Sequence, residues 1–328
     1  MKKSILLIAA LLGAMAWTGC QKIEEELIEE KPEEVTPEDK PTQETITYTL
    51  TIRAEKIPGQ AGNDGTSTKG LAIGDGTEAT TTELKSIWTA NEPVKVYLEG
   101  NCIGTLTATP NNENAHLATL SGTVETTSII TPNTTTLSLL TPRESWDYTG
   151  QIGKLLLSDD ATDSIEKKFH YTMASPVLVT AATDEGENHW TITTANATFT
   201  NQQSIYRLSF RYSVGPTAIT AKSVTISGAS GELVQSQVLG GATTKGPISV
   251  TLGTASADPF FVALRNGDET NEEVFTFTVV DENGVTYRGS KTIPAQYKPN
   301  GTFVSAKNAS LDQRLDLPLS ATTVDTVL

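Results

Sequence analysis

The sequence predicts an all-β protein with two β-sandwich domains in tandem. Short segments with apolar residues at every second position recur along the chain, and this alternation is typical of strands buried on one face. Segments rich in glycine, asparagine and aspartate separate them, as turns between strands do. No window has a sustained helical period, and the many threonines carry the branched side chains that sheets favour.

The first twenty residues have the layout of a secretory signal. Basic residues precede an apolar run, Ile5–Trp17, which is too short to cross a bilayer as a stable helix. Gly19-Cys20 ends this run and resembles a bacterial lipobox. We therefore expect residues 1–19 to be a signal peptide, cleavage between Gly19 and Cys20, and lipidation of Cys20. An ordinary signal peptide with an unmodified cysteine is the alternative.

Residues 20–45 are interpreted as a lipidated acidic tether. Between positions 21 and 44, ten acidic residues and three lysines give a net charge of −7, and few apolar residues are available for a core. Acidic residues directly after a lipidated cysteine resemble the surface-export signal of lipoproteins in Gram-negative anaerobes. We therefore expect a chain that is held in the outer membrane by the lipid on Cys20 and exposed at the cell surface.

The charge of the whole chain excludes several partners. The 328 residues carry a formal charge of −15, and removal of two lysines with the signal peptide brings it to −17. Such a surface repels nucleic acid, and no basic cluster offsets it, so no DNA or RNA partner is expected. With Cys20 lipidated, Cys102 is alone, so no intrachain disulfide is expected.

The first sandwich domain is predicted to span residues 46–185. Its opening strand is Ile46–Ala54, where every second residue is apolar. Residues 58–82 are rich in Gly, Thr, Asn and Asp and predict a long loop. Further strands are predicted at Ser86–Glu99, Cys102–Ala108, Leu117–Val124 and Thr135–Leu140, and Val177–Ala181 is a short apolar run.

The second sandwich domain is predicted to span residues 186–310, followed by a tail, 311–328. The division is placed near residue 185 because the polar cluster Asp184–Asn188 lies between two groups of strands. Asn283-Gly284 predicts a tight hairpin, since this pair tolerates the positive φ that such turns need. The strands predicted here are Trp190–Thr194, Tyr206–Val214, Val224–Ser227, Ile248–Leu252, Phe260–Leu264, Phe275–Val280, Val285–Arg288 and one within Ala295–Ala306.

No residue pattern points to a reaction. His116, His170 and His189 lie far apart, and none has a second histidine at metal-ligand spacing. The chain has no nucleophile-elbow motif and no phosphate-binding glycine loop. Asp159–Asp163 lacks the ligand spacing of a calcium loop, which favours a solvated loop over a Ca²⁺ site. We expect no enzyme, no cofactor and no metal; a glycan hydrolase has only the abundant carboxylates in its favour.

Two aromatic residues are candidates for contact with a glycan. Trp146 and Tyr148 lie in what the sequence predicts to be a polar loop, and exposed aromatic rings can stack on sugars. Packing within the loop is the alternative for both side chains. A surface lipoprotein that binds glycans is therefore the second functional hypothesis.

The order of several motifs resembles the fimbrillins, the type V pilins and their accessory subunits. These motifs are Tyr48–Ala54, Thr68-Lys69, Trp88, Val94–Tyr97, Phe199–Val214 and Gly301-Thr302-Phe303. The resemblance implies two Greek-key (transthyretin-like) sandwich domains and a non-enzymatic fimbrial (pilus) subunit or adhesin. It also implies other fimbrial subunits as partners, and a host or microbial glycan or protein as the adhesion target.

The resemblance further implies maturation by an arginine-specific protease that removes the first strand. A strand of another subunit then fills the vacated groove and restores its main-chain hydrogen bonds. Arg53 is the only arginine before Arg143 and lies at the end of the predicted first strand, so it is the candidate cleavage site. An outward-facing strand charge that is never cut is the alternative for Arg53.

The tail, residues 311–328, is the candidate donor strand in this mechanism. Leu315, Leu317 and Leu319 alternate with polar or small residues, as an inserting strand requires. Pro318 has no N–H group and limits pairing on one side. A frayed tail is the alternative.

Overall fold

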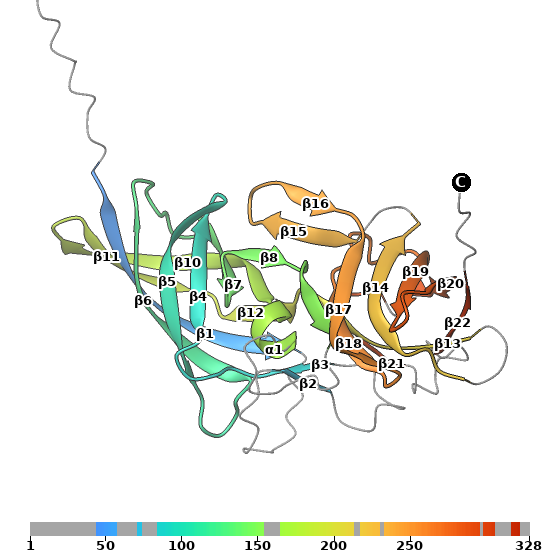
Figure 1. Ribbon diagram of the computed structural model, residues 1–328. Helices are drawn as coiled ribbons and strands as arrows, with labels where there is room; N and C mark the ends of the chain where they lie inside the picture. Colours follow the sequence, from blue (N-terminus) through green and yellow to red (C-terminus); the bar gives the residue numbers. More distant parts are fainter. Residues whose placement is uncertain are drawn as a thin grey trace, which may run out of the picture. The chain divides into compact units, whose positions relative to one another are not determined.

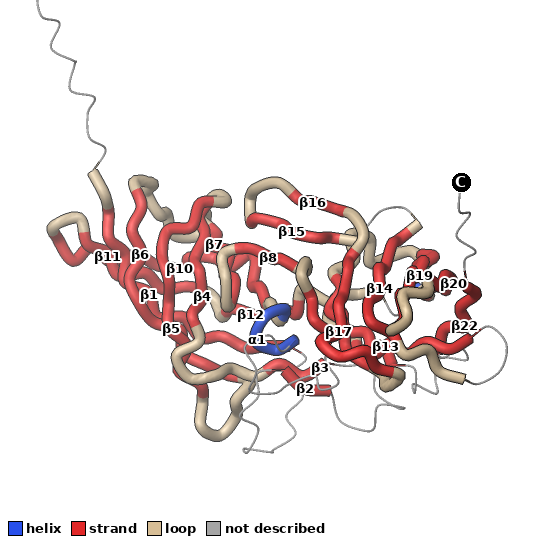
Figure 2. The backbone as a smooth tube through the Cα atoms, in the orientation of Figure 1, coloured by secondary structure: helices blue, strands red, loops and turns tan. Residues whose placement is uncertain are grey.

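The computed structural model describes residues 44–57, 71–73, 84–153, 165–212, 217–229, 233–295, 298–305 and 316–321. Figures 1 and 2 show that strands dominate these residues and that their one helix, α1 (Ile165–Phe169), is short. The predicted all-β class is confirmed. Gln43–Leu328 forms one compact unit, which holds every sheet described below.

The first large sheet closes on itself. Its order is β11-β1-β12-β10-β7-β4-β5-β6, and β1 also pairs with β6. Because of this pairing β1 has a neighbour on each side, and the sheet has no free edge there. Its strands are β1 (Ile46–Ile57), β4 (Pro93–Leu98), β5 (Asn101–Pro110), β6 (Leu117–Thr126), β7 (Thr136–Thr141), β10 (Thr172–Gly186), β11 (His189–Thr194) and β12 (Ala197–Asn201).

The second large sheet has the order β18-β13-β22-β20-β19-β14-β17-β9, with β21 paired to β13 beside this path. The strand nearest the C-terminus, β22, therefore lies inside the sheet, between β13 and β20. The strands are β9 (Gln151–Gly153), β13 (Ser204–Tyr212), β14 (Ala221–Gly228), β17 (Ile248–Ser256), β18 (Phe260–Leu264), β19 (Glu273–Asp281), β20 (Thr286–Ile293), β21 (Phe303–Ser305) and β22 (Asp316–Ala321).

Two small sheets complete the described structure. One pairs β2 (Leu71–Ile73) with β3 (Leu84–Ser86), and the other has the order β16-β15-β8. The strands of the latter are β8 (Ser145–Asp147), β15 (Val234–Val238) and β16 (Thr243–Lys245). β8 and β9 thus pair with strands from the second half of the chain, since β9 lies parallel to β17.

Sheet membership changes between Asn201 and Ser204, where β12 ends and β13 begins. The division expected near residue 185 falls on the turn of the β10–β11 hairpin, inside the first sheet. Gly186, Glu187 and Asn188 have positive φ in this turn. Turn residues and linker residues have the same composition, so the sequence alone did not distinguish them.

The hairpin predicted around Asn283-Gly284 is confirmed. β19 and β20 pair antiparallel along their length, and Gly284 has φ 83° in the connecting turn. The Asp281 side chain accepts hydrogen bonds from the backbone N–H groups of Asn283 and Val285, at 2.9 and 2.8 Å. The turn is therefore held by its own aspartate as well as by the glycine.

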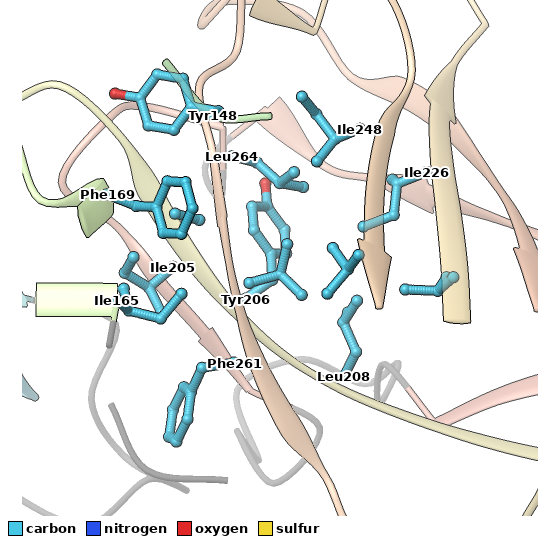
Figure 3. Close-up of a cluster of buried hydrophobic side chains, with 14 of the residues drawn as sticks. Tyr148, Ile165, Phe169, Ile205, Tyr206, Leu208, Ile226, Ile248, Phe261 and Leu264 are labelled. Atoms are coloured by element: carbon cyan, nitrogen blue, oxygen red, sulfur yellow. The ribbon is translucent and has the colours of Figure 1, made fainter. Parts of the chain in front are cut away.

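Each large sheet has its own hydrophobic core. The core of the first sheet includes Tyr48, Leu50 and Ile52 of β1 together with apolar residues of the strands around it. The core of the second sheet includes β13 and β19 but also residues of α1 and the segment after β8. Figure 3 shows Tyr148, Ile165 and Phe169 in one cluster with side chains of β13 and β18. The described residues between β7 and β10 therefore contribute to the core of the second sheet.

Candidate functional site

β1 is a buried strand whose inward side chains fill the core of the first sheet. Tyr48, Leu50 and Ile52 are at most 1% exposed. The hydroxyl of Tyr48 accepts a hydrogen bond from the backbone N–H of Ile130 at 3.0 Å. Removal of this part of β1 would leave three apolar cavities in a row and unpaired backbone groups along the edge of each neighbouring strand.

Arg53 lies within β1, on the face that points to solvent. The strand was predicted to end at Ala54, with Arg53 at its end, but it continues to Ile57. The predicted end was too early because the alternation of apolar residues stops at Ala54, whereas the inward face continues with Lys56, which is 1% exposed. A cut after Arg53 would therefore divide β1 rather than remove it whole.

The backbone around Arg53 is paired on one side only. Toward β6, pairing runs without a break from Ile46 to Glu55, and Arg53 is opposite Thr119. On the other side β11 pairs with β1 up to Leu50, and β12 begins pairing at Ala54. The pairs described for β1 therefore leave a gap, residues 51–53, between its two parallel partners.

A surface pocket of about 560 Å³ lies at this gap. Its lining includes Arg53, Ala54 and Glu55 of β1, Asn196 and Thr198 on the side of the gap, and residues 109–111 and 117–119 on the side of β5 and β6. The pocket therefore gives the Arg53 segment open space on its outer face. A protease must pull a substrate into extended form, so a half-paired exposed residue is easier to reach than a fully paired one.

The C-terminal end of β1 is held by a buried ion pair. Lys56 Nζ is 2.7 Å from Glu92 Oε1. It donates to the backbone oxygen of Ile87 at 3.2 Å and lies 4.3 Å from the centre of the Trp88 ring. Burial and these contacts fix Ala54–Ile57, here called the β1 stub, independently of the residues before Arg53.

Hydrogen bonds keep Glu92 ionised. Thr141 Oγ1 donates to its carboxylate at 2.8 Å, and the backbone N–H of Thr89 donates at 3.2 Å. Burial by itself would raise the pKa of the Glu92 carboxyl, but the Lys56 ammonium and these donors hold that pKa below its usual value. The β1 stub therefore ends in a true ion pair.

A second polar cluster lies next to this pair. Ser86 Oγ donates to Asn201 Oδ1 at 2.5 Å and is 2.9 Å from His170 Nε2. His116 Nδ1 is 2.8 Å from the backbone oxygen of Ser86. Burial is the main cause that lowers the pKa of His170 to about 4, so its ring is neutral at pH 7. Ser86 is fully buried, so this serine–histidine contact is closed to a substrate and joins β3 to β12 instead.

The structure corrects the candidate glycan contacts. Trp146 and Tyr148 are 1% and 0% exposed. β8 pairs with β15, which carries Trp146 into the core of the second sheet, and the Tyr148 hydroxyl donates to the backbone oxygen of Gln202 at 3.1 Å. Polar neighbours such as Asp147 suggested a solvated loop, but they are only the outward residues of a buried segment. Neither ring offers a face to a sugar.

Of the three candidate donor residues, the structure describes two. Leu317 and Leu319 belong to β22, which pairs parallel with β13 and antiparallel with β20 of the same chain. Leu315 lies outside the described residues, as do Gly19 and Cys20 of the signal. The donor role and the lipidation remain predictions. What the structure adds is that the tail strand already occupies a place in its own second sheet.

Sequence reasoning missed the buried charged residues, although it had a signal for them. Lys56 continues the even-numbered inward positions of β1, and Glu273 shares the odd-numbered inward positions of Phe275 and Phe277. A charge in phase with buried positions indicates a partner elsewhere in the core. That partner cannot be read from the sequence, because it comes from a distant strand.

No helix among the described residues is long and apolar enough to span a membrane. They also contain no group of three or more His, Cys, Asp or Glu residues placed to hold a metal ion.

Comparison with known proteins gives only weak likenesses. No family model matches the chain, and no curated protein matches it. A candidate cell adhesion protein from Bacteroides uniformis aligns with 12% identity and a TM-score of 0.36, over 87% of this chain and 99% of its own. A fimbrial assembly protein from Parabacteroides distasonis aligns with 9% identity and a TM-score of 0.32, over 85% and 100%.

A candidate cell adhesion protein from Bacteroides ovatus is similar to the chain at the same level. Its identity is 10% and its TM-score 0.34, over 84% of this chain and 96% of that one. Superpositions this loose carry neither function nor partners over to this chain.

Proposed function

We propose that this chain is a non-enzymatic, lipid-anchored surface protein that serves as a fimbrial subunit or adhesin and assembles by strand exchange. The observation that carries the proposal is the position of Arg53. It is an exposed arginine at the interrupted part of an otherwise buried, doubly flanked strand. The Gly19-Cys20 signal supplies the route to the cell surface and the anchor.

Cleavage of the lipid-anchored precursor after Arg53 would release all residues before Ala54, including Ile46–Arg53 and the anchor, and keep the β1 stub. The released part carries Tyr48, Leu50 and Ile52, whose burial contributes about 5–9 kcal/mol at roughly 1.5–3 kcal/mol for each side chain. That is comparable with the whole stability of a typical domain, about 5–15 kcal/mol. A chain that has lost this segment is driven to accept another strand in its place.

The groove so formed would select its occupant by shape and direction. A donor must run antiparallel to β6 and parallel to β11, as β1 does. It needs apolar side chains at alternate positions to enter the sites of Tyr48, Leu50 and Ile52. The alternating tail of a second copy meets the second requirement, once it has left its own sheet.

Isolation from the native cell surface tests the proposal. We expect an unboiled denaturing gel to show a ladder of bands and N-terminal sequencing of the bands to begin at Ala54. Boiling should collapse the ladder to one band, since the subunits are joined by hydrogen bonds and not by covalent bonds. A single monomer band that keeps residues before Arg53 would overturn the strand-exchange proposal.

The anchor is tested separately. Labelling of cells with a fatty-acid analogue should mark the full precursor, and Cys20→Ala should abolish both the label and the surface location. Labelling that persists in this variant would contradict lipidation at Cys20.

A further inference from the structure

A second buried ion pair lies at the edge of the core of the second sheet. Lys298 Nζ is 3.0 Å from Glu273 Oε2, and the two side chains are 1% and 5% exposed. Two charges removed from water in this way are seldom stabilising by themselves. The stability and the reactivity of the pair therefore depend on the groups around it. Those groups differ from the groups around Lys56 and Glu92.

An amide side chain completes this site. Asn266 is buried, and its Nδ2 donates to the backbone oxygen of Lys298 at 2.6 Å. Among the described residues, its Oδ1 has no hydrogen-bond partner. Buried amide oxygens are normally paired, so this carbonyl group needs an explanation.

A buried tyrosine, Tyr206, lies beside Asn266. Burial is the main cause that raises the pKa of its hydroxyl; a hydrogen bond with Asn266 opposes the rise, and the charge of Glu273 adds to it. The amide of Asn266 and the carboxylate of Glu273 therefore both lie close to this hydroxyl. The Tyr206 ring packs 6.1 Å from that of Phe275, and Figure 3 shows it among apolar side chains. The site is buried.

We propose that Lys298 and Asn266 become joined by an intramolecular amide bond, with Glu273 as the proton carrier. A primary amine, a side-chain amide and a carboxylate in one buried site are the groups that this reaction needs. No cofactor or oxidant takes part.

The step balances with the groups present. Glu273 takes a proton from the Lys298 ammonium, and the uncharged amine attacks Cγ of Asn266. The new C–N bond forms as the bond from Cγ to Nδ2 breaks. Glu273 passes one proton to the leaving nitrogen, which departs as ammonia, and keeps the other, so that its carboxyl group ends uncharged. The product is an uncharged secondary amide, which suits a buried site better than the ion pair it replaces.

The bond would join the two strands on either side of β13 at the same place. Asn266 follows β18 and Lys298 precedes β21, and both strands pair with residues 205–207 of β13. A covalent tie across this junction shortens the unfolded chain and resists separation of β21 from the sheet. It would form whether or not the protein assembles.

The first buried ion pair provides an internal control. The described partners of Glu92 are Lys56 and the hydroxyl and backbone donors of Thr89 and Thr141. No side-chain amide is among them, so no such bond is expected there.

Intact mass of the purified folded chain under denaturing conditions tests the proposal. We expect a mass below that of the sequence by one ammonia, and a branched peptide that contains both Asn266 and Lys298 after digestion. Lys298→Arg, which keeps the charge but has no primary amine, should restore the full mass. A wild-type chain at full sequence mass, or a deficit with no branched peptide, overturns the proposal.

Three further variants identify the proton carrier and exclude other losses of ammonia. Glu273→Gln keeps the shape of the side chain and should abolish the deficit, whereas Glu92→Gln should leave it unchanged. Asn283-Gly284 can lose ammonia on its own by ring closure, so Asn283→Ala should also leave the branched peptide in place. If the Glu273→Gln chain still contained the branched peptide, Glu273 would not be the proton carrier, and that part of the proposal would fail.

Discussion

The two terminal strands of the described structure, β1 and β22, both lie inside a sheet but are held very differently. β1 pairs with β6 from Ile46 to Glu55 and with two further strands on its other side. β22 pairs with four residues of β13 and two of β20. Figure 1 shows β1 as a long strand and β22 as a short one near the C-terminus.

This difference indicates which strand can exchange freely and which needs to be cut. A strand with a long ladder on one side and buried aromatic and aliphatic side chains does not leave its sheet at a useful rate. A strand held by a few backbone pairs opens at a lower free-energy cost. In the proposed function, β22 is the strand that moves, and β1 is the strand that proteolysis removes.

The largest effect is expected from deletion of Ile46–Arg53 from the mature chain. The loss of three buried side chains costs about 5–9 kcal/mol, which removes most of the stability of the first sheet. We expect no cooperative thermal transition for that sheet by calorimetry, and recovery of the transition when a peptide of residues 46–53 is added. A deletion variant as stable as the full chain would show that β1 does not contribute this stability.

The next largest effect concerns the β1 stub. Lys56→Ala leaves the Glu92 carboxylate buried without its cation, which costs about 3–5 kcal/mol. Chemical denaturation should measure this loss. Lys56→Met combined with Glu92→Met removes both charges and should be less destabilised than the single variant. If the double variant were the less stable of the two, the pair would contribute net stability of its own.

Acid should weaken the polar cluster beside the stub. His170 binds a proton near pH 6.5 in the unfolded chain but only near pH 4 in the folded chain. The unfolded state therefore binds more protons between these values, and stability falls as the pH is lowered from 6.5 to 4, by up to about 3 kcal/mol. His170→Gln should flatten urea-unfolding stability across this window. An equally steep pH dependence in that variant would remove His170 as the cause.

Removal of the tail should have the smallest effect on stability. Deletion of residues 316–328 breaks the pairs of β22 with β13 and β20, at a net cost of about 1–3 kcal/mol for a few exchanged hydrogen bonds. The thermal transition of the second sheet should shift down but stay cooperative. Loss of folding in this variant would contradict the contrast between β22 and β1.

The parts of the fold that follow local rules were predictable from the sequence. β13 and the β19–β20 hairpin were found because alternation and the Asn-Gly turn act over a few residues. The end of β1 was not predicted, because Lys56 is a buried charge whose partner, Glu92, lies far away in the sequence.

Long-range packing accounts for the other errors. Nothing near Trp146 indicates that β8 will pair with β15, so a fully buried ring was interpreted as a surface ring. The turn at Gly186 was taken for a linker because the pairing of β10 with β11 depends on register across the turn. Arg53 was named as a candidate cleavage site from the sequence, but the interrupted ladder beside it was not predicted.

Limited digestion of the purified chain with an arginine-specific protease tests the central claim most directly. Arg53 and Arg288 are both exposed strand residues, but Arg288 is paired on both sides, with β19 and β22. We predict that cleavage occurs at Arg53 first, that the product begins at Ala54, and that it then forms oligomers that survive an unboiled denaturing gel. Arg53→Gln should abolish both cleavage and oligomers, and Arg288→Gln neither. A product that begins at Ala54 but stays monomeric would contradict the account.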